Sequence, residues 1–224
     1  MIKVGILGAA GYTGGELIRL LINHPQAEIV FANSESNAGN LVSDVHEGLL
    51  GETELRFTDE MPFDQVDVVF FCFGHGKSAT FLKEHTIPEN VKIIDLAQDF
   101  RIKGDHDYIY GLPETHKDLI ADCQHLANPG CFATCIQLAM LPALKAGIIS
   151  GDIHVNGITG STGAGQKPGA TTISRGATTT FLSIRPSPIS TCWRLTRRCR
   201  SCAQVMTDAY CSSLSEAVSQ GASS

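Results

Sequence analysis

The sequence has little positive charge and no cluster of it along most of its length. Its 224 residues hold 17 Lys and Arg against 23 Asp and Glu, a formal net charge of −6. The first three quarters contain no concentration of basic residues, which argues against nucleic acid or an anionic membrane as the partner. We therefore expect a small-molecule substrate, and an anionic one would need a few local cations.

A secretory signal and a long apolar run are also missing. The first apolar stretch, VGILGAAGYTG, is broken by glycines and has neither a basic leader nor a cleavage site. We therefore expect a cytoplasmic protein, in which the eight cysteines are free or catalytic thiols rather than disulfides. No internal repeat is visible, and the 43% hydrophobic content predicts a globular chain.

Residues 1–178 alternate short apolar segments with helical or loop segments. Four of these segments have the length and composition of buried strands, at residues 2–7, 28–32, 66–73 and 91–96. Such alternation is typical of an α/β protein with a doubly wound parallel sheet of the Rossmann type. We place this domain at residues 1–150, and a shorter second domain begins near Gly151.

Residues 179–224 have a different composition. This tail holds four of the eight cysteines, the single tryptophan and five arginines but no lysine, and it shows no sustained helical or strand period. We therefore predict no regular structure there. A zinc site is one interpretation, but the cysteine spacing does not pair two C-x-x-C knuckles. Our preferred hypothesis is that the chain is read out of frame from about Thr179, and resequencing codons 175–185 would test it. The four tail cysteines are Cys192, Cys199, Cys202 and Cys211.

The stretch VGILGAAGYTGGEL joins a predicted strand to a predicted helix. Gly8, Gly11 and Gly14 are spaced G-x-x-G-x-x-G, which permits a tight turn, a close approach to a pyrophosphate and close helix packing. Tyr12 and Thr13 would then begin the helix whose N-terminus holds the phosphate. The alternative is a glycine-rich turn that binds nothing.

The end of the second predicted strand carries the residues expected to choose between NAD and NADP. The carboxylate of Glu35 would favour the ribose hydroxyls of NAD, whereas Ser34 and Ser36 could hold the 2′-phosphate of NADP. The sequence leaves both readings open.

Cys131 lies in the stretch NPGCFAT, between a turn and an apolar run. The run has helical spacing, so we expect Cys131 in the first turn of a helix, where partial positive charge stabilises a thiolate. From the residues alone, Cys131 is either a nucleophile or a buried core residue. We expect Cys135, one turn later, to pack in the core. The apolar positions that set the helical period are Ile136, Leu138, Ala139, Leu141 and Leu144.

Six segments agree in order and spacing with one known family. They are GAAGYTGGEL, FGHGKS (its last five residues are 74–78), DLAQDFR (95–101), YGLPE (110–114), NPGCFAT and GSTGAGQKPGA (160–170). Over residues 1–178 the chain resembles the N-acetyl-gamma-glutamyl-phosphate reductases. The resemblance implies NADP as cofactor, an N-acetylglutamyl phosphate substrate and Cys131 as the attacking nucleophile. It also implies a homo-oligomer for the intact family member. The second domain would be α+β and semialdehyde-dehydrogenase-like; residues 151–178 form its beginning, and it is truncated here.

The resemblance suggests further ligand residues. The glycine-rich segment with Ser161, Gly163 and Gly165 would lie near the nicotinamide and phosphate, although a plain flexible loop is the alternative. For the substrate it suggests a short set of positions, which in each case could equally be structural. These positions are Arg101, His75 and Asn128. No metal site is expected.

The sequence departs from the family pattern in two places that bear on activity. Family members carry a histidine general base well after the cysteine, and this chain has no histidine after His154. Ala97 replaces the serine usual in the DLSxDFR segment. Two alternatives to the reductase therefore stand, an inactive NADP-binding fragment and a related semialdehyde dehydrogenase.

Overall fold

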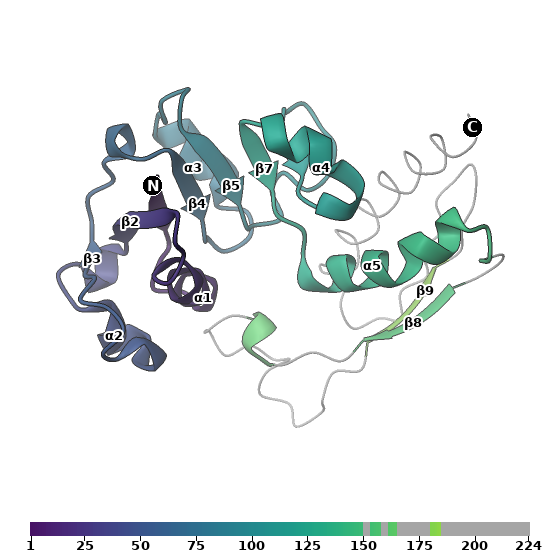
Figure 1. Ribbon diagram of the computed structural model, residues 1–224, viewed down its shortest axis with the longest axis horizontal. Coiled ribbons are helices and arrows are strands. Elements are labelled where there is room, and N and C mark those ends of the chain that lie inside the picture. The colour runs from purple at the N-terminus through teal and green to yellow at the C-terminus, as the bar shows by residue number, and fades with distance from the viewer. Residues whose placement is uncertain (150–152, 158–160, 165–179, 185–224) are drawn as a thin grey trace. The chain divides into compact units, whose positions relative to one another are not determined.

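The computed structural model describes residues 1–149, 153–157, 161–164 and 180–184. The chain divides into two compact units. Figure 1 colours the ribbon by residue number from the N-terminus to the C-terminus. Unit 1 comprises Met1–Phe100, Asp107–Gly111 and Asp118–Asn128. Unit 2 comprises Arg101–His106, Leu112–Lys117 and Pro129–Ser224.

Unit 1 is built on a seven-stranded sheet in the order β3-β2-β1-β4-β5-β7-β6, and every pairing is parallel. The strand order reverses between β1 and β4, which is where such sheets open a ligand crevice at their carboxyl edge. The predicted doubly wound parallel sheet is therefore confirmed. Its strands are β1 (Ile2–Leu7), β2 (Ala27–Asn33), β3 (Phe57–Thr58), β4 (Val68–Phe71), β5 (Lys92–Asp95), β6 (Ile109–Tyr110) and β7 (His125–Ala127).

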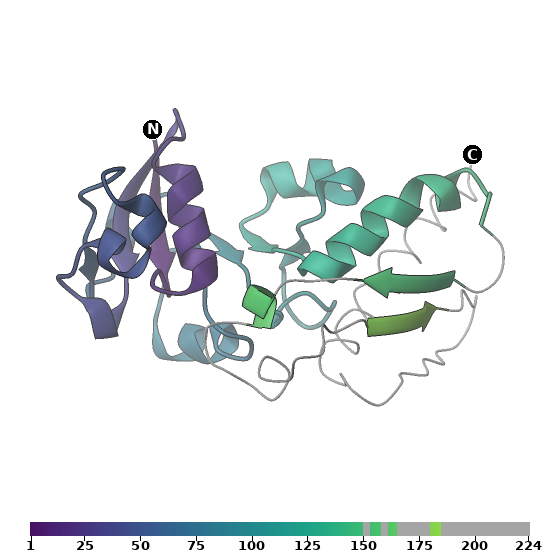
Figure 2. The ribbon, with the colours of Figure 1, turned by 90° about the horizontal axis from the view of Figure 1, so that it is seen from below.

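Helices cover both faces of this sheet. Alternate strand residues point to opposite sides, so each face contributes to its own core. On β4, Val68 joins a core with Ile18 of α1, whereas Val69 joins a second core against which Phe81 of α3 packs. Figure 2 shows α1 and α3 on opposite sides of the sheet. The helices are α1 (Tyr12–Leu21), α2 (Val42–Val45), α3 (Ser78–Glu84) and α4 (Pro113–Asp122), with 3₁₀ turns at Glu35–Asn37, Glu47–Leu49 and Phe63–Gln65.

Unit 2 contains the longest of the described helices, α5 (Cys131–Lys145), and an antiparallel pair, β8 (Ile153–Gly157) and β9 (Thr180–Ile184). Ile136 and Met140 on one face of α5 pack with Ile153 and Val155 of β8. Both views show α5 running beside this strand pair. A 3₁₀ turn, η4, spans Ser161–Ala164.

The strand β9 differs from the expectation for the tail. It lies inside residues 179–224, for which the sequence predicts no regular structure, and all five of its residues pair with β8. The segment TFLSI has β-branched and aromatic residues at three of five positions, which suits a strand. The rest of the tail, with the four cysteines of the zinc alternative, lies outside the described residues.

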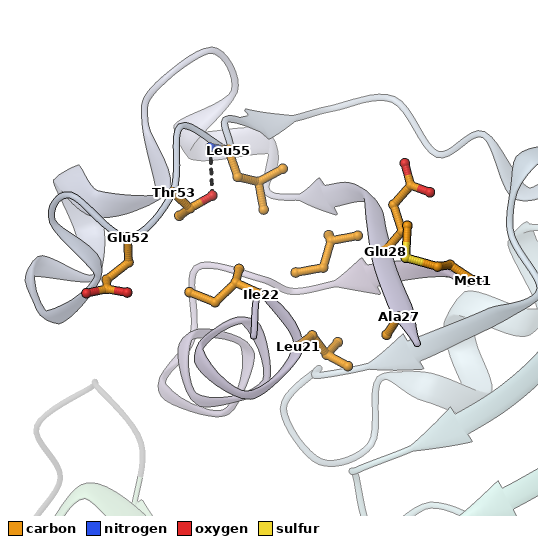
Figure 3. Close-up of a pocket in the computed structure, with 9 residues that line it drawn as sticks. Met1, Leu21, Ile22, Ala27, Glu28, Glu52, Thr53 and Leu55 are labelled. Atoms are coloured by element: carbon orange, nitrogen blue, oxygen red, sulfur yellow. Dashed lines mark hydrogen bonds between the residues drawn. The ribbon is translucent and has the colours of Figure 1, made fainter. Parts of the chain in front are cut away.

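An open pocket of about 340 Å³ lies at the amino ends of β1 and β2 (Figure 3). It is therefore at the sheet edge opposite the glycine turn and carries none of the predicted site residues. Across the described parts of the chain, no helix is long and apolar enough to cross a membrane. The pocket is lined by Met1, Leu21, Ile22, Ala27, Glu28, Ile29, Glu52, Thr53 and Leu55.

Candidate functional site

The glycine turn between β1 and α1 has the geometry that a pyrophosphate site needs. Gly8 has a φ of +71°, and a Cβ there would lie 2.8 Å from the backbone oxygen of Cys72. Gly14 is buried, and its Cβ would lie 2.6 Å from the backbone oxygen of Ala9. Helix α1 starts at Tyr12, with Gly11 as N-cap, no side-chain cap and no acidic residue in its first turn. Its first N–H groups therefore suit an anion, and these residues fit a dinucleotide.

His46 contacts this glycine turn although it is far from it in sequence, and it was not among the site residues predicted from the sequence. Its Nε2 donates a hydrogen bond to the Ala9 backbone oxygen at 2.9 Å. Its ring also fills the space beside Gly15, where a Cβ would lie 2.4 Å from His46 Nδ1. His46 therefore holds the turn in place, although it lies 37 residues from Ala9 along the chain. No local pattern marks it, because the contact depends on how α2 returns to the sheet.

The end of β2 presents two serine hydroxyls held by one amide. Asn37 Nδ2 donates to Ser34 Oγ at 3.1 Å and to Ser36 Oγ at 3.0 Å. A hydroxyl that accepts from Asn37 keeps its own proton for another acceptor, such as a phosphate oxygen. Ser34 is buried, whereas Glu35 and Ser36 are exposed. The arrangement therefore offers hydroxyl donors where dinucleotide folds read the adenosine ribose.

The loop after β4 is tied to the loop after β5 by Asp99. Asp99 Oδ2 accepts a hydrogen bond from the Gly76 N–H at 2.8 Å, and Oδ1 accepts one from the Ala79 N–H at 3.2 Å. Ala79 lies in the first turn of α3, so the carboxylate caps that helix from another loop. The predicted ligand residue His75 is exposed and lies inside the loop that Asp99 fixes.

Replacing Asp99 with alanine is expected to loosen this loop. Two charge-assisted hydrogen bonds are lost, so the free energy of unfolding should fall by about 1–3 kcal/mol. Urea unfolding would measure this, with Asp99→Asn as an intermediate case because an amide keeps a single oxygen. Asp105→Ala is the control: Asp105 is exposed, and an equal loss there would mean that the contacts of Asp99 carry no special stability.

A buried carboxylate, Asp95, sits at the end of β5. Its Oδ1 accepts hydrogen bonds from Ser78 Oγ at 2.7 Å and from the Ala97 N–H at 3.0 Å. Burial, and after it the charge of Asp95, raises the pKa of the Cys72 thiol from its ordinary 9.0 to about 12. The same two causes raise the pKa of Tyr108, with smaller contributions from Asp107 and Asp99. Cys72 therefore keeps its proton to a higher pH than an ordinary thiol does, which argues against it as a nucleophile.

The raised pKa of Cys72 predicts a loss of stability in alkali. Above pH 9 the unfolded chain ionises this thiol while the folded chain does not, so unfolding becomes easier as pH rises toward 12. Between pH 8 and pH 10 the free energy of unfolding should fall by about 1 kcal/mol more in the parent chain than in Cys72→Ala. Urea titrations at both pH values would measure this, and identical pH slopes for the two chains would contradict it.

In unit 2, Cys131 is the first residue of α5 and is exposed. Gly130 is the N-cap, its backbone oxygen accepts a hydrogen bond from the Thr134 N–H at 2.9 Å, and no acidic residue lies in the first turn. The predicted position of Cys131 in a helix N-terminus is therefore confirmed, and it is not a core residue. Cys135 is exposed as well, so the expectation that it packs in the core is wrong. The buried face of α5 is instead formed by Ala133, Ile136, Gln137 and Met140.

Arg101 lies against the residue before this cysteine. A Cβ placed on Gly130 would come within 2.9 Å of Arg101 Nη1, so only glycine leaves the guanidinium this close to the helix N-terminus. Arg101 is half-buried and belongs to the same unit as Cys131. An exposed thiol, helix N–H donors and a planar cation thus lie in one stretch, a set of groups that could receive an anionic acyl group.

The remaining predicted residues are spread over both units. Asn128, in unit 1, donates its backbone N–H to the Asp95 backbone oxygen at 2.8 Å. Ser161 and Gly163 lie in η4 of unit 2, and Gly165 is outside the described residues. Within the residues that are described, no three His, Cys, Asp or Glu side chains converge as metal ligands would.

Two domain families match the chain. Residues 3–123 match the semialdehyde dehydrogenase NAD binding domain, and residues 131–183 match the semialdehyde dehydrogenase dimerisation domain. Among curated proteins, the N-acetyl-gamma-glutamyl-phosphate reductases of Bacteroides thetaiotaomicron and Phocaeicola vulgatus are each 63% identical over 172 residues. That alignment covers 76% of this chain and 53% of each relative, so the chain spans about half the length of the curated relatives it matches.

Solved structures agree on the fold. Aspartate semialdehyde dehydrogenase II from Vibrio cholerae is 24% identical with a TM-score of 0.56, covering 74% of this chain and 48% of that one. Aspartate semialdehyde dehydrogenase with NADP from Candida albicans is 15% identical with a TM-score of 0.52, covering 92% of this chain and 75% of that one.

Proposed function

The chain belongs to the semialdehyde dehydrogenase family, and from this premise we propose that it reduces N-acetyl-gamma-glutamyl phosphate to N-acetylglutamate semialdehyde with release of phosphate. The observation that carries the proposal is the exposed Cys131 at the start of α5, with the Arg101 guanidinium against Gly130. The similarity to the reductases supports this substrate over the others that the family uses.

In the proposed reaction, the Cys131 thiolate attacks the acyl carbon of the substrate. A C–S bond forms, the C–O bond to phosphate breaks, and the product is a thioester on Cys131. The first N–H groups of α5 stabilise the oxyanion that develops on the acyl oxygen. Arg101 neutralises charge on the departing phosphate or on a substrate carboxylate.

We propose NADP as the cofactor. Its reduced form, when bound, would supply a hydride to the thioester carbon, the C–S bond to Cys131 would break, and the products would be the semialdehyde and the free thiolate. The glycine turn with Gly8, Gly11 and Gly14 would hold the pyrophosphate, with Tyr12 and Thr13 at the helix start. Ser34 and Ser36 would donate to the 2′-phosphate, which favours NADP over NAD. We also propose that the intact protein is a homo-oligomer, which the match to a dimerisation domain supports. A cytoplasmic location is part of the same proposal.

Phosphate-dependent reduction of NADP⁺ with N-acetylglutamate semialdehyde tests this function, with aspartate semialdehyde as the competing substrate. Turnover with the first substrate alone supports the proposal. Preference for aspartate semialdehyde would instead indicate the related dehydrogenase. NADP binding without turnover would indicate the non-catalytic fragment. The lack of a histidine general base after His154 would then explain the absence of turnover.

Gly130→Ala is expected to weaken substrate use without weakening the fold. The backbone at Gly130 has φ −75° and ψ 154°, which alanine adopts freely, but the new Cβ displaces the Arg101 guanidinium. Loss of one charged contact should lower kcat/KM by about tenfold to a hundredfold. Steady-state kinetics and thermal unfolding would measure both quantities. An unchanged kcat/KM would show that Arg101 is a structural cation.

A further inference from the structure

Helix α5 begins with two thiols one turn apart. Cys131 and Cys135 are both free and both exposed, and they occupy positions i and i+4. Residues with this spacing share one face of a helix, with Cβ atoms about 5–6 Å apart. Helical side chains lean toward the N-terminus, so the Cys135 thiol leans toward Cys131. The opposite face, with Ile136 and Met140, is the one that packs.

This separation is unsuited to a direct disulfide but suited to a bridged pair. A disulfide needs Cβ atoms about 3.5–4.5 Å apart, which an intact helical turn does not provide. A thiophilic atom between the two sulfurs replaces the single S–S bond of about 2.05 Å by two bonds to sulfur. Each of these is about 2.3 Å long if it resembles a Zn–S bond. The added length allows both thiols to bind while α5 stays helical.

The other described thiols lack this arrangement. Cys72 directly follows β4 and packs against the core of unit 1, where burial raises its pKa to about 12. Cys123 is partly buried, and its Sγ donates to the Ile120 backbone oxygen at 3.3 Å. Among the described residues, Cys131 and Cys135 are the thiols that are both exposed and one helical turn apart.

We propose that Cys131 and Cys135 form a dithiol site for trivalent arsenicals. With an organic arsenic(III) oxide, two As–S bonds form, the As=O bond breaks, and the two thiol protons leave with the oxygen as water. Arsenic stays trivalent, so no oxidant or reductant is needed. If Cys131 is the nucleophile proposed above, occupancy of this site would also block acyl transfer, but the site itself does not depend on that role.

Chelation sets the expected strength. Once one thiol has bound, the second is presented at an effective concentration in the millimolar range, which raises affinity by about 10²–10⁴ over a single thiol. The adduct should therefore resist a monothiol such as 2-mercaptoethanol and be removed by a dithiol such as 2,3-dimercaptopropanol. A single-thiol adduct would be removed by both.

The test uses phenylarsine oxide on the full chain, kept reduced with a phosphine, and is read by mass spectrometry. Trypsin cuts after Lys117 and Lys145, so residues 118–145 form one fragment with Cys123, Cys131 and Cys135. We expect one arsenical bridging Cys131 and Cys135 in this fragment, retained in 2-mercaptoethanol. Adducts on the four tail cysteines fall in other fragments, and a chain with those four changed to serine simplifies the stoichiometry.

Single substitutions decide the outcome. Cys131→Ser and Cys135→Ser should each lower retention on the fragment by about 10²-fold, whereas the matched Cys123→Ser should not change it. Equal retention in Cys135→Ser, or an adduct that includes Cys123, would overturn the proposal. Because the readout is mass and not turnover, failure here is distinguishable from failure of the proposed function.

Discussion

Cys131→Ser is expected to abolish turnover while leaving NADP binding unchanged. A serine hydroxyl at the start of α5 is a far weaker nucleophile than a thiolate, and no thioester can form. Loss of a catalytic nucleophile commonly costs several orders of magnitude, so kcat should fall by at least about 10⁴. The change removes one sulfur from an exposed position, so the fold should be unaffected.

The measurement pairs steady-state kinetics with NADP titration followed by fluorescence. Cys123→Ser is the control, since it removes a partly buried thiol from the same tryptic fragment and should leave kcat within twofold. Residual activity above a few per cent in Cys131→Ser would mean that another group forms the covalent intermediate, or that none is formed. Loss of NADP binding along with turnover would point to misfolding instead.

Gly14→Ala is expected to damage both the stability of unit 1 and its dinucleotide binding. The added Cβ would meet the Ala9 oxygen at 2.6 Å and the Ala9 carbonyl carbon and Cα at 2.7 Å. All three are backbone atoms of the glycine turn, so the turn itself must shift. Overpacking of this kind costs about 1–3 kcal/mol, and misdirected N–H donors should weaken NADP binding by about tenfold to a hundredfold.

A graded series makes this prediction specific. Gly8→Ala adds a strained φ of +71° to a contact of 2.8 Å with the Cys72 backbone oxygen, so it should be at least as harmful. Gly11→Ala meets a single atom, the Gly8 oxygen at 3.4 Å, and should be milder. Gly48→Ala has open space and is the control. Equal NADP affinity in all four variants would show that the turn holds no pyrophosphate.

Local periodicity is sufficient to predict much of this fold. The segments Ile2–Leu7 and Ala27–Asn33 form strands within a residue of the positions expected, and α5 begins at Cys131 as the apolar spacing indicates. The order of motifs also predicts the resemblance to the reductases, and relatives of that name are 63% identical over 172 residues. These features depend on neighbours in sequence, which is why one sequence suffices for them.

Contacts between distant loops could not be predicted in this way. His46 reaches Ala9, Asp99 reaches Gly76, and the Arg101 guanidinium lies against Gly130, all through the register of the sheet or the path of a loop. The exposure of Cys135 was missed for a related reason. Apolar composition on α5 extends around most of the helix, and only the position of β8 decides which face is covered.

The most direct test of the account is to look for the acyl group on Cys131. The purified chain would be mixed with N-acetyl-gamma-glutamyl phosphate in the absence of NADPH, quenched in acid and mapped by mass spectrometry of the fragment with residues 118–145. We expect an N-acetylglutamyl thioester on Cys131, absent in Cys131→Ser and released by hydroxylamine. An unmodified Cys131 in a folded chain, or an acyl group on a different residue, would contradict it.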